Sequence, residues 1–188
     1  AREKGIPVIF DPVGVGATQL RTNAAGRIID EVQPAVIRGN MSEMKILAGL
    51  DAGIKGVDSI AGEQDGEMVA RRLARKYGCI TAITGQQDII AQGDRICRID
   101  NGNALLSRVT GTGCMTTGLV ACFCGVESDL FWGTAAGVMV MGLAGEMAKS
   151  TLQTGEGLGT FRVRLFDAVC SLTPDDIIND GKLTVIEG

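Results

Sequence analysis

The chain has 188 residues, of which 45% are apolar, so it is long enough for one domain with a substantial core. A net charge of −4 and the lack of a long basic run argue against a nucleic-acid-binding surface. The absence of histidine excludes a Ser–His–Asp triad, a histidine general base and a His-ligated zinc site. We expect a single domain over residues 1–188, without a linker.

Apolar runs and their periodicity predict the elements in chain order. Residues 1–5 are typical of the last turn of a helix closed by Gly5, so we expect earlier secondary structure to be missing from this chain. The expected strands are 6–11, 35–38, 79–84, 88–92 and 95–99, the last two joined as a hairpin by Gly93-Asp94. The expected helices are 21–32, 43–48 capped by Ser42, 66–77, 113–125, 128–149, 160–171 and a short one at Thr173-Pro174, with a loop at 49–62.

The alternation of buried strands with helices predicts a parallel sheet covered by helices on both faces. In such sheets ligands bind beyond the carboxyl ends of the strands. Asp11, Arg38, Thr84 and Gly111 all fall at or just after the carboxyl end of an expected strand. We therefore expect these four residues to converge on one edge of the sheet.

Two features indicate the cellular setting. The strongly apolar segment 130–148 is short for a membrane span and lacks basic flanks, so we expect a buried helix and no membrane. The six cysteines form no C-x-x-C pair, and no signal peptide is visible. We therefore expect reduced thiols and a cytoplasmic protein.

The most informative segment is Val-Thr-Gly-Thr-Gly-Cys at 109–114, at the start of a predicted helix. Gly111, Thr112 and Gly113 allow a backbone to approach an anion, and free N–H groups at a helix start point toward it. Cys114 would then face a bound phosphoryl group. A tight strand-to-helix turn with a buried cysteine explains the same pattern, because short Gly-x-Gly sequences are common.

Polar residues at the other strand ends permit matching chemistry. Asp11 and Glu43 can hold Mg²⁺ through water, as hard oxygen ligands do beside phosphates. Arg38 can donate two hydrogen bonds to phosphate oxygens, and Thr84 begins a turn typical of a nucleotide contact. Each residue also has a simpler structural explanation. Asp11 could cap the following turn, and Glu43, near Asn40 at a helix start, could interact favourably with the helix dipole. Arg38 could form a surface ion pair, and Thr84 could belong to an ordinary turn.

Four stretches together resemble the hydroxyethylthiazole kinase family of the ribokinase-like superfamily. They read Asp-Pro-Val-Gly-Val-Gly-Ala-Thr (11–18), Ile-Arg-Gly-Asn-Met-Ser-Glu (37–43), Thr-Gly-Gln-Gln-Asp (84–88) and Val-Thr-Gly-Thr-Gly-Cys (109–114), in order and at matching spacing. The resemblance covers nearly the whole chain. It implies a ribokinase-like three-layer α/β/α fold with a mainly parallel central sheet, first strands missing. It also implies phosphorylation of the hydroxyl of 4-methyl-5-(2-hydroxyethyl)thiazole by ATP with Mg²⁺, in thiamine salvage.

Carried over position by position, the resemblance assigns roles to single residues. Arg38 and Thr84 look like ATP contacts, and we place Asn40 with them as cofactor-binding. Asp11 and Glu43 match the acidic positions near magnesium.

In the fourth stretch, residues 111–114 would form the anion hole, and Gly111 looks like a substrate-site residue. Cys114 stands where many ribokinase-like enzymes carry an aspartate base. Phosphoryl transfer depends mainly on positioning and charge neutralisation. We therefore expect Cys114 to orient the substrate hydroxyl more than to remove its proton.

The chain also departs from the family pattern. Gln86 stands where members often have Glu, and Glu156 where they often have Pro. Family members are longer by roughly a quarter to a third at the N-terminus. They form trimers with the site between subunits, so we expect a homotrimer only for the full-length form. This chain would carry the nucleotide half of the site and lack part of the thiazole pocket.

Other functions remain open. A hydroxymethylpyrimidine (phosphomethylpyrimidine) kinase shares Gly-Thr-Gly-Cys but usually has His before it, where Val109-Thr110 stand here. A nicotinamide-nucleotide hydrate dehydratase normally has Asp at the position of Cys114. A non-catalytic nucleotide-binding remnant is a third reading. A Rossmann dehydrogenase is not favoured, because neither Gly14-x-Gly16 nor Gly111-x-Gly113 has its third glycine in register.

Overall fold

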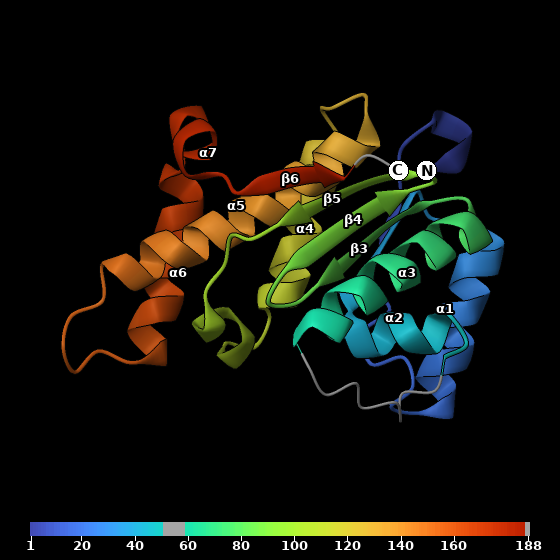
Figure 1. Cartoon of the computed structure of the whole chain (residues 1–188), viewed down its shortest axis with the longest axis horizontal. Coiled ribbons are helices and arrows are strands. Elements are labelled where there is room, and N and C mark those ends of the chain that lie inside the picture. The colour runs from blue at the N-terminus through green and yellow to red at the C-terminus, as the bar shows by residue number, and fades with distance from the viewer. Residues whose placement is uncertain (51–58, 187–188) are drawn as a thin grey trace.

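The structure is a computed structural model that describes residues 1–50 and 59–186. Its centre is a sheet in the order β1-β2-β3-β4-β5-β6 (Figure 1). The strands are β1 (Ile9–Phe10), β2 (Val36–Asn40), β3 (Ile80–Thr84), β4 (Asp88–Gln92), β5 (Arg95–Ile99) and β6 (Leu183–Ile186). Strands β1 to β3 are parallel neighbours, whereas the pairings from β3 through β6 are all antiparallel. The prediction of a mainly parallel sheet is therefore wrong, because the hairpin and the last strand join the same mixed sheet.

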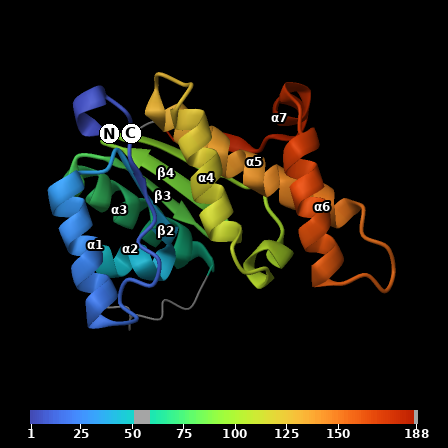
Figure 2. The same ribbon diagram turned by 180° about the vertical axis from the view of Figure 1, so that it is seen from behind.

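Helices cover both faces of the sheet and complete three layers (Figures 1 and 2). They are α1 (Gln19–Val32), α2 (Met41–Leu47), α3 (Ser59–Tyr77), α4 (Thr112–Cys124), α5 (Leu130–Ser150), α6 (Leu158–Ser171) and α7 (Pro174–Asp180). Short 3-10 helices span Arg2–Lys4 and Ala104–Arg108. Helices α1 to α3 lie on one face and α4 and α5 on the other, with α6 packed outside against α5.

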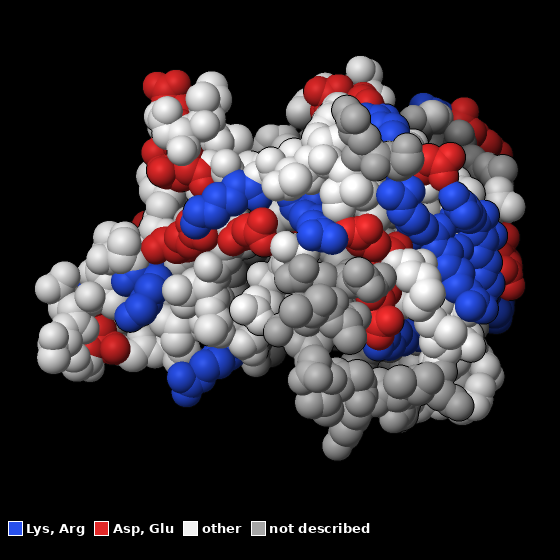
Figure 3. All heavy atoms as spheres, viewed as in Figure 1, with Lys and Arg blue, Asp and Glu red and all other residues white. Residues whose placement is uncertain are grey.

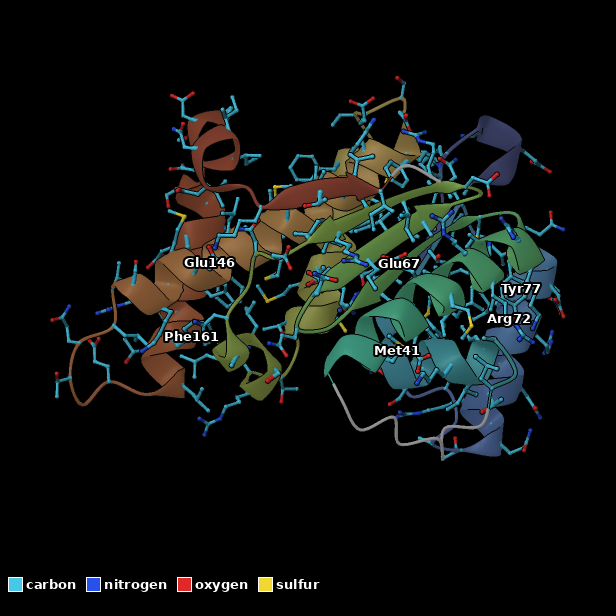
Figure 4. All side chains as sticks on the ribbon, viewed as in Figure 1. Met41, Glu67, Arg72, Tyr77, Glu146 and Phe161 are labelled. Atoms are coloured by element: carbon cyan, nitrogen blue, oxygen red, sulfur yellow. The ribbon has the colours of Figure 1, made fainter. Side chains whose placement is uncertain are left out.

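The two faces of the sheet bury separate apolar clusters because successive strand residues point to opposite sides. On β2, Ile37 packs toward α2 and α3, whereas Val36 packs toward α4 and α5. A third cluster joins α5 to α6 around Phe161, a fully buried side chain labelled in Figure 4. Each helix layer is thus held by its own apolar contacts.

Helix α5 is the one helix among the described residues that is long and apolar enough to cross a membrane. In this fold, 72% of its apolar window is buried, in contact with the sheet, α4 and α6. It approaches α4 so closely that a Cβ on Gly137 would lie 2.5 Å from the Cα of Val120. The expected buried helix is confirmed.

Some local predictions hold and others do not. The hairpin β4–β5 has the predicted bounds, and Thr173 caps α7 with Pro174 in its first turn. The cap of α2 is Asn40 and not Ser42, because the amide side chain accepts a hydrogen bond from the N–H of Glu43. Helix α3 begins at Ser59, so the loop expected at 49–62 is shorter, and 51–58 lie outside the described residues. Strand β6 was not predicted.

Candidate functional site

Arg38 lies in the middle of β2 and links residues at the ends of the two neighbouring parallel strands. From β2, its Nη1 donates to Oδ2 of Asp11, just after β1, at 3.3 Å. Its Nη2 donates to Oγ1 of Thr84, the last residue of β3, at 2.5 Å. The side chains of Arg38 and Asp11 are each only 11% exposed, so this is not the surface ion pair considered as the simpler reading. The predicted convergence of Asp11, Arg38 and Thr84 is confirmed, but two details are wrong. Arg38 lies in the middle of β2, and Gly111 follows the 3-10 helix Ala104–Arg108 instead of a strand.

The glycine-rich turn lies against the same guanidinium. A Cβ added to Gly113 would stand 2.9 Å from Nη1 of Arg38, so any larger residue would push the guanidinium away from the turn. Gly111 has open space around it and instead adopts φ +99°, a conformation that favours glycine. Glycine is therefore favoured at these two positions of the motif for different physical reasons.

Helix α4 begins in this turn with its first N–H groups open. Gly111 is the N-cap and supplies no side-chain cap hydrogen bond. The hydroxyl of Thr112 lies 2.9 Å from the carbonyl of Leu106 and 3.1 Å from that of Val109, so this side chain holds the turn. Cys114 is exposed, which contradicts the reading of a buried cysteine. The helix start can thus offer backbone donors and a thiol to a ligand.

Asn40 and Glu43 form a capping box at the start of α2. Each accepts a hydrogen bond from the other's backbone N–H at 3.0 Å. The second carboxylate oxygen of Glu43 accepts from the N–H of Gly14 at 2.8 Å, which ties the loop after Asp11 to α2. The simpler helix-start role is therefore present for both residues, and a ligand contact by either remains a prediction.

The donor set fits a water-mediated magnesium ion better than a protein-enclosed metal. Among the described residues, no group of three or more His, Cys, Asp or Glu side chains is placed to hold an ion. Asp11 and Glu43 offer carboxylate oxygens that keep free lone pairs beyond the hydrogen bonds described above. Mg²⁺ is commonly held by one or two carboxylates with water and substrate phosphates.

Two residues near this edge were missed by sequence reasoning. Asp88, the first residue of β4, is buried and accepts the N–H of Gly85 at 2.9 Å. Burial raises the pKa of the Asp88 carboxyl to about 7, although the Gly85 N–H and the charge of Arg38 act to lower it. Thr117 donates to Asp11. Its spacing of four residues from Gly113 is the signal that indicates a shared helix face.

Basic side chains gather elsewhere, on the outer face of α3 (Figure 3). A hollow of about 760 Å³ there is lined by Glu67, Met68, Arg71, Arg72, Arg75 and Lys76. Glu67 also pairs with Arg98 on β5 (Figure 4). None of the predicted site residues lines this hollow, so size alone does not locate the candidate site.

Known proteins share this sequence pattern. The model of the hydroxyethylthiazole kinase family matches residues 1–175. A hydroxyethylthiazole kinase from Clostridium beijerinckii is 44% identical over 192 residues, which cover 99% of this chain and 69% of that protein. One from Alkaliphilus oremlandii is 45% identical over 187 residues, with the same coverage. The chain spans 69% of the length of these two relatives.

Solved structures agree. The hydroxyethylthiazole kinase protein from Pyrococcus horikoshii superposes with a TM-score of 0.86 and 32% identity, over 100% of this chain and 68% of that one. The ADP/ATP-dependent NAD(P)H-hydrate dehydratase from Bacillus subtilis has a TM-score of 0.55 at 17% identity, over 71% of this chain and 47% of that one, and shares the fold alone. The family match, the relatives and the close superposition together show that this chain belongs to the hydroxyethylthiazole kinase family.

Proposed function

We propose that this chain transfers the γ-phosphoryl group of ATP to the hydroxyl of 4-methyl-5-(2-hydroxyethyl)thiazole. Membership of a kinase family implies the use of ATP. The observation that carries the proposal is the position of Arg38, which hydrogen-bonds Asp11 and Thr84 and lies against Gly113. One guanidinium on β2 thereby brings together the ends of β1 and β3 and the glycine-rich turn.

The start of α4 is the proposed anion hole. The N–H groups of Thr112, Gly113 and Cys114 in the first turn would bind the transferring phosphoryl group, with the helix dipole favouring its charge. Gly111 lets the substrate approach the turn, and the exposed thiol of Cys114 orients the hydroxyl. Because the reaction depends chiefly on positioning and charge neutralisation, a weak base at this point suffices.

The proposed binding sites for the nucleotide and the metal ion lie at the carboxyl edge of the parallel strands. Arg38 uses two of its five N–H donors on Asp11 and Thr84, so donors remain for phosphate oxygens. Asn40 and Thr84 would line the ATP side. Asp11 and Glu43 would hold Mg²⁺ through water, and the ion would neutralise phosphate charge.

Further parts of the proposal rest on the family resemblance. They are a single ribokinase-like domain over residues 1–188, a cytoplasmic location, and a homotrimer in the full-length form. Light scattering on the purified chain measures the oligomeric state directly.

A coupled ADP-release assay tests the activity. We expect turnover with the thiazole alcohol and at least tenfold lower kcat/KM with hydroxymethylpyrimidine. Cys114→Asp should keep or raise activity if position 114 takes the substrate proton, and complete loss with normal ATP binding would contradict that role. ATP binding without turnover of either alcohol would instead identify a non-catalytic nucleotide-binding chain.

A further inference from the structure

Thr117 lies on α4, one helical turn beyond Gly113. Its hydroxyl donates a hydrogen bond of 2.8 Å to Oδ2 of Asp11, a residue 106 positions away in the sequence. This bond is a direct polar link between the helix that begins in the glycine-rich turn and the acidic residue after β1.

A threonine in a helix commonly bonds back to the carbonyl four residues earlier. Thr116 does this, with its hydroxyl 2.9 Å from the carbonyl of Thr112. Thr117 lies 3.2 Å from the carbonyl of Gly113, farther than it lies from Asp11. A hydroxyl has one proton, and a bond to a carboxylate is shorter and stronger than one to a neutral carbonyl. The hydroxyl of Thr117 is therefore assigned to Asp11.

Both side-chain donors to Asp11 reach the same oxygen. Arg38 donates to Oδ2 from β2 and Thr117 donates to Oδ2 from α4. Two donors from different elements fix the rotation of the carboxylate. No side-chain hydrogen bond or ion pair within the described residues engages Oδ1, which is therefore available to a ligand.

We propose that Thr117 is a positioning residue that holds Asp11 so that Oδ1 faces the hydrated Mg²⁺ of bound ATP. The inference rests on the proposed function. It adds that α4, which begins at the anion hole, also orients the Asp11 carboxylate toward the metal ion. The position of the phosphoryl group and that of the metal ion are thereby coupled through the Thr117 hydroxyl. Thr117 itself does not touch the reacting atoms.

Thr117→Val removes the hydroxyl and keeps the shape of the side chain. Thr116→Val is the matched control, because it removes a neighbouring helical hydroxyl that bonds only within α4 among the described residues. ATP affinity is measured by calorimetry at several Mg²⁺ concentrations and in EDTA. We expect Thr117→Val to weaken Mg²⁺-dependent ATP binding about tenfold, the loss of one good hydrogen bond. Affinity in EDTA should not change, and Thr117→Ser should restore binding to within about twofold.

Three outcomes would overturn the assignment. One is equal loss in Thr117→Val and Thr116→Val, and another is a loss for Thr117→Val that is the same with and without Mg²⁺. The third is failure of the serine variant to restore binding while its thermal unfolding matches that of the unsubstituted chain. If the unsubstituted chain itself binds no ATP with Mg²⁺, the proposed function fails and the role of Thr117 fails with it.

Discussion

A second polar cluster, around Asn101 after β5, contrasts with the one around Arg38. Asn101 is 3% exposed, and its amide donates to Glu146 and to the carbonyl of Asp180 while accepting from the N–H of Lys182. Glu146, labelled in Figure 4, accepts further bonds from the N–H of Gly102 and the ammonium of Lys182. Every polar atom of the Asn101 side chain therefore has a protein partner.

The Arg38 cluster is not saturated in this way. Within residues 1–50 and 59–186, Nε of Arg38 is buried and has no hydrogen-bond partner, and the N-cap of α4 supplies no side-chain bond to the first turn. Unmet hydrogen bonds lower stability, so a protein that keeps them does so at positions where a ligand completes them. The contrast indicates that the Asn101 cluster closes the fold and that the Arg38 cluster is arranged for binding.

The largest expected effect is on the binding cluster, from Gly113→Ala. The new methyl group would displace the Arg38 guanidinium from its place against the turn. We expect kcat/KM to fall about 10³-fold, on the order of 4 kcal/mol, with little change in thermal unfolding. Gly118→Ala on the same helix meets open space and should leave kcat/KM unchanged. A comparable loss in both variants would show that α4 tolerates no substitution. It would then give no evidence that the Arg38 cluster is specifically arranged for binding.

Asn101→Ala should have the opposite signature. It leaves the carbonyl of Asp180, the N–H of Lys182 and one bond of Glu146 without their partner. We expect the free energy of unfolding to fall by about 3 kcal/mol in denaturant titration, with unchanged ATP affinity. Asn103→Ala removes a single cap bond to Leu105 and should lower stability by only about 1 kcal/mol. Weakened ATP binding in folded Asn101→Ala would show that the two clusters are coupled.

Asp88→Asn gives the smallest effect and tests the junction between the parallel and antiparallel halves. Since the folded-state pKa is raised to about 7, the buried carboxyl stays protonated at acidic pH and stability falls as pH rises through that value. Asparagine keeps an acceptor for Gly85 and never ionises. We expect the variant to gain roughly 2 kcal/mol relative to the unsubstituted chain between about pH 5.5 and 8. Parallel stability–pH curves for the two proteins would contradict the buried-acid assignment.

The sequence signals that succeeded were local. Gly93-Asp94 between two apolar runs sufficed to predict both strands of the hairpin, because turn chemistry fixes the register. Asp11 and Thr84 could be expected to lie at one edge of the sheet, because neighbouring parallel strands end there. Arg38 was expected at the end of its strand but reaches both residues from the middle of β2. Glycine at 113 was expected for anion approach, although the structure shows that it also makes room for Arg38.

The missed features depend on tertiary contacts. Strand β6 is only four residues long, two of them exposed, and it becomes a strand only by pairing with β5. The spacing from Gly113 places Thr117 on the same helix face, but its bond to Asp11 spans 106 residues, so no local pattern identifies Asp11 as the partner. Asn40, and not the predicted Ser42, caps α2, because the Glu43 side chain at position N3 can accept a hydrogen bond from the Asn40 N–H.

The glycines of α5 limit how this protein can be altered in the laboratory. Replacing helical glycine with alanine is a common route to greater heat resistance, worth about 1 kcal/mol at open positions. Here a Cβ on Gly133, Gly137 or Gly142 would stand 3.2, 2.5 and 2.5 Å from backbone atoms of Cys124, Val120 and Asn101. These backbone neighbours cannot move aside as a flexible side chain would. The usual gain in stability therefore becomes a loss at Gly137 and Gly142 and shrinks at Gly133, so sequence libraries for this family member should keep Gly137 and Gly142 fixed.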